Sequence, residues 1–148
     1  MSKNKSKLIG YVTNNEFNEK IIPIPFQNTI LRNYCQDNNY VYLLPYNEMI
    51  FKNSYSQLIT MINKIDKNTA IICCSIFMLP EKIFYLKKII QALNQKNTYI
   101  YSLYEDIYVQ NVKDIETIDY NKKIIKLNKN FFSDKKFKAY LNKLLHKV

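Results

Sequence analysis

The stretch "AIICCSIFMLPEK", residues Ala70–Lys82, carries the strongest signal of the fold. It opens with an unbroken apolar run, which is typical of a strand covered on both faces. Pro80 and Glu81 follow at the place where a helix would begin. Proline suits the first helical turn, and an acidic side chain there is stabilised by the helix dipole. A buried strand that leads into a helix predicts a parallel sheet with crossover helices.

The same alternation extends in both directions along the chain. Strands are predicted over residues 7–13, 40–44, 69–75 and 98–105, and the segments between them have the spacing of amphipathic helices. Pro23 and Pro25, Ser54 and Pro80 mark the expected helix starts. We therefore expect an α/β fold with a four-stranded parallel sheet in the flavodoxin-like order 2-1-3-4 and helices on both faces.

The C-terminal part of the sequence has a weaker pattern. Residues 114–129 are compatible with a helix or with a helix followed by a short strand, and residues 132–148 predict a last helix capped by Ser133. We expect one α/β domain over 1–148, in which residues 7–110 form the sheet and its crossover helices and residues 111–148 form a lysine-rich helical extension.

The net charge of +10 comes from the ends of the chain. Residues 111–148 hold ten lysines against four acidic residues, whereas residues 8–110 are nearly balanced. This pattern predicts a solvated surface, or contact with an acidic partner or membrane face. Arg32 is the one arginine. Because arginine is the residue that binds phosphate and guanine through two hydrogen bonds, its scarcity argues against nucleic acid as a partner.

Rare residue types exclude several kinds of site. A single glycine rules out a P-loop and a G-x-G-x-x-G motif, and a single histidine, His146, argues against a histidine-rich metal site and a Ser-His-Asp triad. We expect no metal and no cofactor. Cys73 and Cys74 point to opposite faces of their strand, so C-x-x-C chemistry is excluded. Buried reduced thiols, no membrane-length apolar run and no signal-peptide pattern predict a cytoplasmic protein.

Polar side chains follow the predicted strands at their carboxyl ends, where open parallel sheets bind ligands. We expect binding roles for Thr13, Asn14, Gln27, Arg32 and Ser75, and acid or base roles for Glu48 and Glu105 if the protein has turnover. Each side chain also has a structural interpretation. Thr13, Ser75 and Glu105 could cap the next segment, Gln27 could bind loop carbonyls, and Glu48 could be a solvated turn residue. Ser75 lacks an obvious base, so we do not expect it to be a nucleophile.

The overall pattern resembles the N-terminal catalytic domain of serine recombinases. The shared features are a "GYVTNN" strand, the helix "FQNTILRNYCQDNN" that ends in "YC", and the segment "IICCSIFMLPEK". The resemblance implies the fold but not the reaction. Asn15 occupies the position of the nucleophilic serine, Thr13 occupies that of an arginine, and DNA strand exchange is therefore not expected.

A second resemblance is to the sporadic carbohydrate cluster protein family. Its motifs are similar to "GYVTNNEF", "IPIPFQNTILRNYC", "LLPYNEM", "CSIFMLPE" and "YEDI", and the resemblance covers about residues 10–121. This resemblance implies genes that lie in clusters for surface carbohydrates. It places Thr13, Gln27, Arg32, Glu48, Ser75 and Glu105 on motif positions, and Asn14 stands where the family has serine.

We therefore expect a cytoplasmic protein of surface-polysaccharide or modified-sugar biosynthesis that binds a sugar or sugar nucleotide at the strand ends. The sequence leaves open whether the protein is an enzyme. One alternative is a non-catalytic partner of a carbohydrate-biosynthesis enzyme that is contacted through the lysine-rich C-terminal helix. Another, which we ranked last, is a nucleic-acid-binding resolvase-like domain without recombinase activity. The substrate and the oligomeric state do not follow from the sequence.

Overall fold

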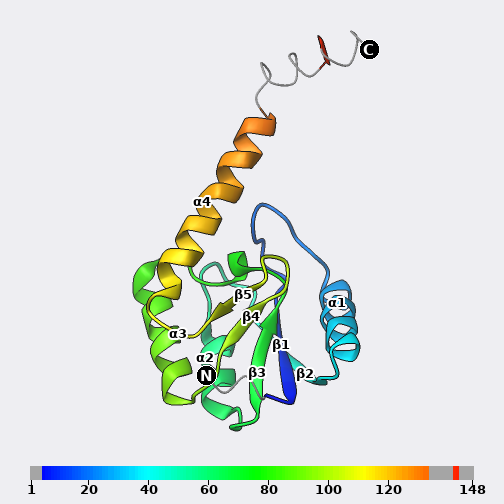
Figure 1. The fold of residues 1–148 in the computed structure, drawn as a ribbon, viewed down its shortest axis with the longest axis vertical. Coiled ribbons are helices and arrows are strands. Elements are labelled where there is room, and N and C mark those ends of the chain that lie inside the picture. Colours follow the sequence, from blue (N-terminus) through cyan, green and yellow to red (C-terminus); the bar gives the residue numbers. More distant parts are fainter. Residues whose placement is uncertain (1–4, 134–141, 144–148) are drawn as a thin grey trace. The chain divides into compact units, whose positions relative to one another are not determined.

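The computed structural model describes residues 5–133 and 142–143, and the chain divides into two compact units, 1–115 and 116–148. The helices and strands alternate along the first unit, as Figure 1 shows. In chain order they are β1 (Lys7–Val12), α1 (Ile24–Asp37), β2 (Val41–Asn47), α2 (Ser56–Lys64), β3 (Thr69–Cys73), the 3₁₀ turn η1 (Ile76–Met78), α3 (Ile83–Gln95), β4 (Ile100–Ser102), β5 (Ile107–Val109) and α4 (Asp114–Ser133).

One sheet organises the first unit. Its strand order is β2-β1-β3-β4-β5, with parallel pairing throughout except between β4 and β5. The α/β class and the order 2-1-3-4 are confirmed, and the sheet has a fifth, antiparallel strand that was not expected. β4 and β5 form a hairpin, which is possible because antiparallel neighbours need no crossover helix.

Helices cover the two faces of the sheet unequally. Figure 1 shows α1 on one side of the sheet and α2 and α3 together on the other. All five residues of the central strand β3 are buried, which agrees with its apolar sequence. The core comprises mainly aliphatic residues of the sheet and the inner helix faces, including Leu8, Leu31, Leu58, Ile62, Ile71, Ile72, Leu79, Ile89, Ile90 and Ile100.

The segment after β3 differs from the expected direct entry into a helix. Ser75 begins the short 3₁₀ turn η1, and α3 begins only at Ile83. Because the helix starts later, Ile83 is more than half exposed instead of lining the buried face with Leu86, Ile90 and Leu93. Ser54 is likewise not the N-cap of α2, because Tyr55 occupies that position. The Tyr55 side chain makes no capping hydrogen bond to the helix.

Strand β2 continues through Pro45, where we expected it to stop. Ile9 pairs with Leu43 and Tyr11 pairs with Tyr46, so β2 contains one residue more than β1 over this stretch. The extra residue is a β-bulge. Proline is tolerated there because β2 is an edge strand of the sheet.

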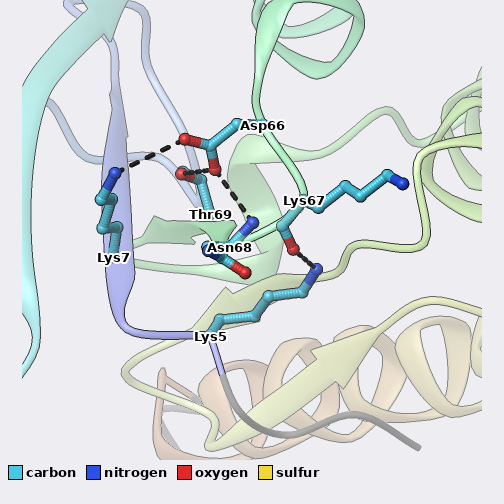
Figure 2. A network of polar contacts seen from close by, with 6 residues as sticks. All are labelled: Lys5, Lys7, Asp66, Lys67, Asn68 and Thr69. Carbon is cyan, nitrogen blue, oxygen red and sulfur yellow. Dashed lines mark hydrogen bonds and ion pairs between the residues drawn. The ribbon is translucent and has the colours of Figure 1, made fainter.

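A polar network holds the amino end of the sheet, as Figure 2 shows. The Asp66 carboxylate accepts hydrogen bonds from the Thr69 hydroxyl at 2.6 Å and the Asn68 backbone N–H at 2.9 Å, and it lies 3.5 Å from the Lys7 ammonium. These two hydrogen bonds are the main causes of the lowered pKa of Asp66. The Lys5 ammonium donates to the Lys67 carbonyl. The α2–β3 loop is thus tied to the start of β1.

In the second unit, α4 continues as one helix to Ser133, so no strand follows the helix within residues 114–129. Asp119 and Lys123 form an ion pair of 2.7 Å one turn apart. The last helix predicted over residues 132–148 falls largely outside the described residues. Over the part of the chain that the structure describes, no helix has both the length and the apolar character that a membrane span requires.

Candidate functional site

Gln27 and Thr13 form a closed pair at the carboxyl end of β1. The Gln27 side-chain oxygen accepts a hydrogen bond from the Thr13 N–H at 3.2 Å, and its amide nitrogen donates to the Thr13 carbonyl at 2.6 Å. The same nitrogen also donates to the Ile22 carbonyl at 2.6 Å. Gln27 is completely buried in the first turn of α1. Its polar atoms therefore hold the β1–α1 loop in place.

Glu48 joins the end of β2 to the start of α2. One carboxylate oxygen accepts hydrogen bonds from the Tyr11 hydroxyl at 3.0 Å and the Leu58 N–H at 3.2 Å. The other oxygen accepts from the Met49 and Gln57 N–H groups and from the Ser54 hydroxyl, at 2.9–3.3 Å. Helices leave their first N–H groups without internal partners. Glu48 satisfies two of those groups in α2, although it lies outside the helix.

Ser75 and Glu105 meet beside the end of β3. The Ser75 hydroxyl donates to one Glu105 carboxylate oxygen at 2.6 Å and accepts from the Phe77 N–H at 3.2 Å. The other Glu105 oxygen accepts from the Ile76 N–H at 3.0 Å and from the Ser102 hydroxyl. The pair fixes η1 against the β4–β5 turn, so Ser75 lies at the start of the 3₁₀ turn.

Asn14 and Arg32 differ from the residues of these clusters because their side chains are exposed to solvent. Both are exposed, Asn14 directly after Thr13 and Arg32 on the outer side of α1. Asn15 takes part in the loop structure, because its N–H donates to the Thr13 hydroxyl at 2.9 Å and its side-chain amide donates to the Met49 carbonyl at 2.8 Å. The structure thus joins Thr13 to Gln27 and Ser75 to Glu105, and it engages Glu48 in a third network.

The three cysteines are buried free thiols. Burial raises the pKa of Cys35 to about 11, and burial together with the nearby Glu105 charge raises that of Cys74 to about 12. Burial is also the main cause of the raised pKa of Cys73. A nucleophilic cysteine needs a lowered pKa, and the pKa values of these thiols are shifted in the opposite direction. Among the described residues, no group of three or more histidine, cysteine or acidic side chains is placed to hold a metal ion.

No family model matches the chain, and no curated protein matches it either. Several solved structures share its fold, among them an integrase domain and a recombinase. The N-terminal catalytic domain of the TP901-1 integrase is 13% identical with a TM-score of 0.52, and the match covers 84% of this chain and 98% of that domain. A resolvase family site-specific recombinase from Streptococcus pneumoniae is 10% identical with a TM-score of 0.53, over 93% of this chain and 99% of that chain. The fold is similar to that of recombinase catalytic domains.

These neighbours correct the functional expectation drawn from the sequence. The solved structures that share the fold include an integrase domain and a site-specific recombinase, so the expectation of a sugar-binding protein of surface-polysaccharide biosynthesis is wrong. The resemblance to the carbohydrate cluster family receives no support, whereas the resemblance to resolvases does. The low rank that we gave to nucleic acid as a partner is corrected in the same direction.

Sequence reasoning missed one feature of the strand-end surface, which is a set of exposed apolar side chains. They lie in the loop after β2 and at the start of α3, and the most exposed are Ile50, Phe51, Ile83 and Phe84. The sequence does contain a signal. "MIF" at 49–51 sits among polar loop residues, and "IF" at 83–84 precedes the first buried position of α3.

Proposed function

We propose that the protein binds DNA through the lysines of its second unit and does not catalyse strand exchange. The observation that carries this proposal is the charge of α4, which follows an α/β unit similar to recombinase catalytic domains. Between Asp119 and Asp134 the chain has four lysines, Lys122, Lys123, Lys126 and Lys129, and no acidic residue. Further lysines follow at 135, 136, 138, 143 and 147.

Lysine suits binding that does not depend on base sequence. An ammonium group attracts phosphate as a point charge, whereas sequence recognition in the major groove relies strongly on arginine. Lys123, Lys126 and Lys129 follow one another at intervals of three positions, so successive members of the set are neighbours on the surface of α4, whereas Lys122 is buried. Helical spacing of this kind lets several lysines reach neighbouring phosphates at once. The proposal therefore concerns the DNA backbone.

The first unit supports binding without catalysis. Asn15 stands at the position that the resemblance assigns to the nucleophilic serine, and its side-chain amide already donates to the Met49 carbonyl. Thr13 stands at the arginine position, and its hydroxyl accepts from the Asn15 N–H. Strand exchange needs a nucleophile that can form a covalent bond to phosphate, and an amide is not one. A cytoplasmic location, where thiols stay reduced, is part of the proposal.

Fluorescence anisotropy of a labelled DNA duplex with the full chain tests the proposal. Affinity should fall steeply between 50 and 200 mM salt, because bound lysines release counterions. The triple variant K123Q/K126Q/K129Q should lower the slope of log affinity against log salt by up to about 3, at roughly 0.9 for each lost phosphate contact. The control K20Q/K64Q/K96Q removes the same charge from exposed positions of the first unit.

The control should keep most of the affinity and most of the salt slope. Equal losses in the two variants would show that only net charge matters, and they would contradict the assignment to α4. If the folded full chain did not bind DNA at 50 mM salt, this result would contradict the proposal.

A further inference from the structure

Two segments present apolar side chains to solvent at the end of the sheet where the parallel strands finish. We call Ile50, Phe51, Ile83 and Phe84 the crest patch, and their exposed fractions are 73%, 65%, 55% and 63%. Scattered single apolar residues on a surface are ordinary, but large exposed side chains that gather in one place mark an interaction site. The side chains of the crest patch do not pack in the core of the protein, so their exposure indicates contact with a binding partner.

Local contacts hold the first segment in a turn. The Phe51 N–H donates to the Met49 carbonyl at 2.8 Å, and the Ser54 N–H donates to the Phe51 carbonyl at 3.1 Å. Asn53 takes a left-handed backbone conformation with φ of 62°, which asparagine tolerates better than most residues. Asn15 anchors the turn through the Met49 carbonyl. Ile50 and Phe51 are thus exposed on an ordered loop.

The second segment lies beside the first. α2 packs against α3, and Figure 1 shows that both helices cover the same side of the sheet. Both follow carboxyl ends of parallel strands, so their first turns lie at the same end of the unit. The Glu81 carboxylate also contributes, after burial, to the raised pKa of the Tyr55 phenol at the start of α2. The β2–α2 loop and the start of α3 are therefore neighbours.

Lysines surround the crest patch. The two segments, residues 49–52 and 81–88, hold Lys52, Lys82, Lys87 and Lys88, and Glu81 is their one acidic residue. All four lysines are exposed, and the Lys88 ammonium lies 4.5 Å from the centre of the Phe84 ring. A second copy of the chain would bring an equally basic rim against this one, and like charges repel. The binding partner of the crest patch must therefore offer an apolar region to the exposed side chains and negative charge to the lysines around them.

We propose that the crest patch inserts into the surface of an anionic lipid bilayer. The aromatic and aliphatic side chains would enter the boundary between headgroups and acyl chains, and the lysines would contact the acidic headgroups. Stable attachment to a bilayer takes two weak signals together, and this surface provides both. The inference is independent of the DNA proposal, because it concerns residues 49–88 of the first unit and that proposal concerns α4.

The absence of tryptophan from the sequence gives a sensitive test. In Phe51→Trp the new indole is the sole tryptophan fluorophore of the full chain. With vesicles of phosphatidylglycerol and phosphatidylcholine its emission should shift to shorter wavelength, as the indole leaves water. The control Val41→Trp places the indole at an exposed position where β2 begins, at the other end of the sheet, and its emission should not shift. Vesicles of phosphatidylcholine alone should shift neither.

Matched variants separate insertion from general charge attraction, to which the lysines of α4 also contribute. F51S/F84S should lower the partition coefficient in vesicle sedimentation at least about tenfold, although every lysine is kept. K52Q/K88Q should also lower it about tenfold or more, at roughly a factor of five for each lysine. K64Q/K96Q removes the same charge at the far ends of α2 and α3 and should have a much smaller effect.

Three results would overturn the inference. They are an unshifted Phe51→Trp emission with anionic vesicles, unchanged sedimentation of F51S/F84S, and concentration-dependent dimerisation of the wild-type chain that F51S/F84S abolishes. The last result would assign the crest patch to a second copy. A urea midpoint of F51S/F84S equal to that of the wild type would show that the variant is folded. Its unchanged DNA affinity in the anisotropy assay would show that the two proposals stand or fall separately.

Discussion

The Tyr11 hydroxyl donates a hydrogen bond of 3.0 Å to the Glu48 carboxylate across two neighbouring strands, and both side chains are buried. The same carboxylate accepts from the first N–H groups of α2. Burial, and then the charge of Glu48, raises the pKa of Tyr11, so the phenol stays a donor at every physiological pH. One acidic side chain thus connects β1, β2 and α2.

Glu48→Gln should destabilise the fold by about 2–4 kcal/mol. The new amide nitrogen would face N–H and O–H donors, and it cannot accept their hydrogen bonds. Tyr11→Phe should cost only about 1 kcal/mol, since it removes one donor and leaves the carboxylate with its other partners. Urea denaturation measures both changes in the free energy of unfolding. A stability of Glu48→Gln equal to that of the wild type would show that the network contributes nothing.

Gln27→Ala should destabilise the protein by about 2–4 kcal/mol, because the buried N–H and carbonyl of Thr13 lose their partner. Gln27→Glu should be similarly harmful at neutral pH, because a carboxylate cannot donate to the carbonyls of Thr13 and Ile22. The control is Gln91→Ala at an exposed position of α3, which should change the stability by less than about 0.5 kcal/mol. A Gln27→Ala variant as stable as the control would contradict the structural role.

Gly10→Ala should destabilise the fold by about 1–3 kcal/mol through overpacking. A Cβ atom at Gly10 would lie 2.2 Å from the Tyr42 hydroxyl oxygen and 3.1 Å from the Pro45 Cβ. The Tyr42 hydroxyl donates to the Asn28 side chain at 2.9 Å, so the ring cannot move without losing that bond. In the background of Tyr42→Phe, Gly10→Ala should therefore cost less. Strictly additive effects in this double-mutant cycle would refute the proposed clash.

Stability should fall as the pH rises above about 9, the ordinary pKa of the cysteine thiol. Cys35 and Cys74 have raised pKa values in the folded protein, so the unfolded chain loses these protons first. Their contribution is complete below pH 9 and is lost as the pH rises towards 11–12. The measurement is the urea midpoint from pH 8 to 10.5, compared with C35A/C74A, in which the fall should be shallower. Iodoacetamide should modify the thiols only after unfolding.

The sequence predicted the order of the first four strands because apolar strands and amphipathic helices have different periods. It missed β5, since Ile107–Val109 is only three residues long and pairs through a hairpin whose turn includes Asp106 at a φ of 54°. Local residues do not reveal such short antiparallel strands until the neighbouring strand is known.

The sequence also predicted which polar residues lie at the strand ends, but it did not predict what their side chains contact. A buried glutamine or glutamate at a strand end is compatible with a ligand or with the backbone of a nearby loop. In Gln27, Glu48 and Glu105 the backbone takes that place. The choice depends on loop paths after Thr13 and Asn47, which periodicity does not describe.

The bulge in β2 has a consequence for how the protein behaves at high concentration. An outermost strand with exposed apolar side chains, such as Leu44 at 87%, is a template on which other chains can add in register and aggregate. The extra residue and the missing N–H of Pro45 interrupt that template midway. Replacing Pro45 by a β-branched residue would lengthen the regular part of this edge strand. The longer regular edge should promote the growth of fibrils at high protein concentration.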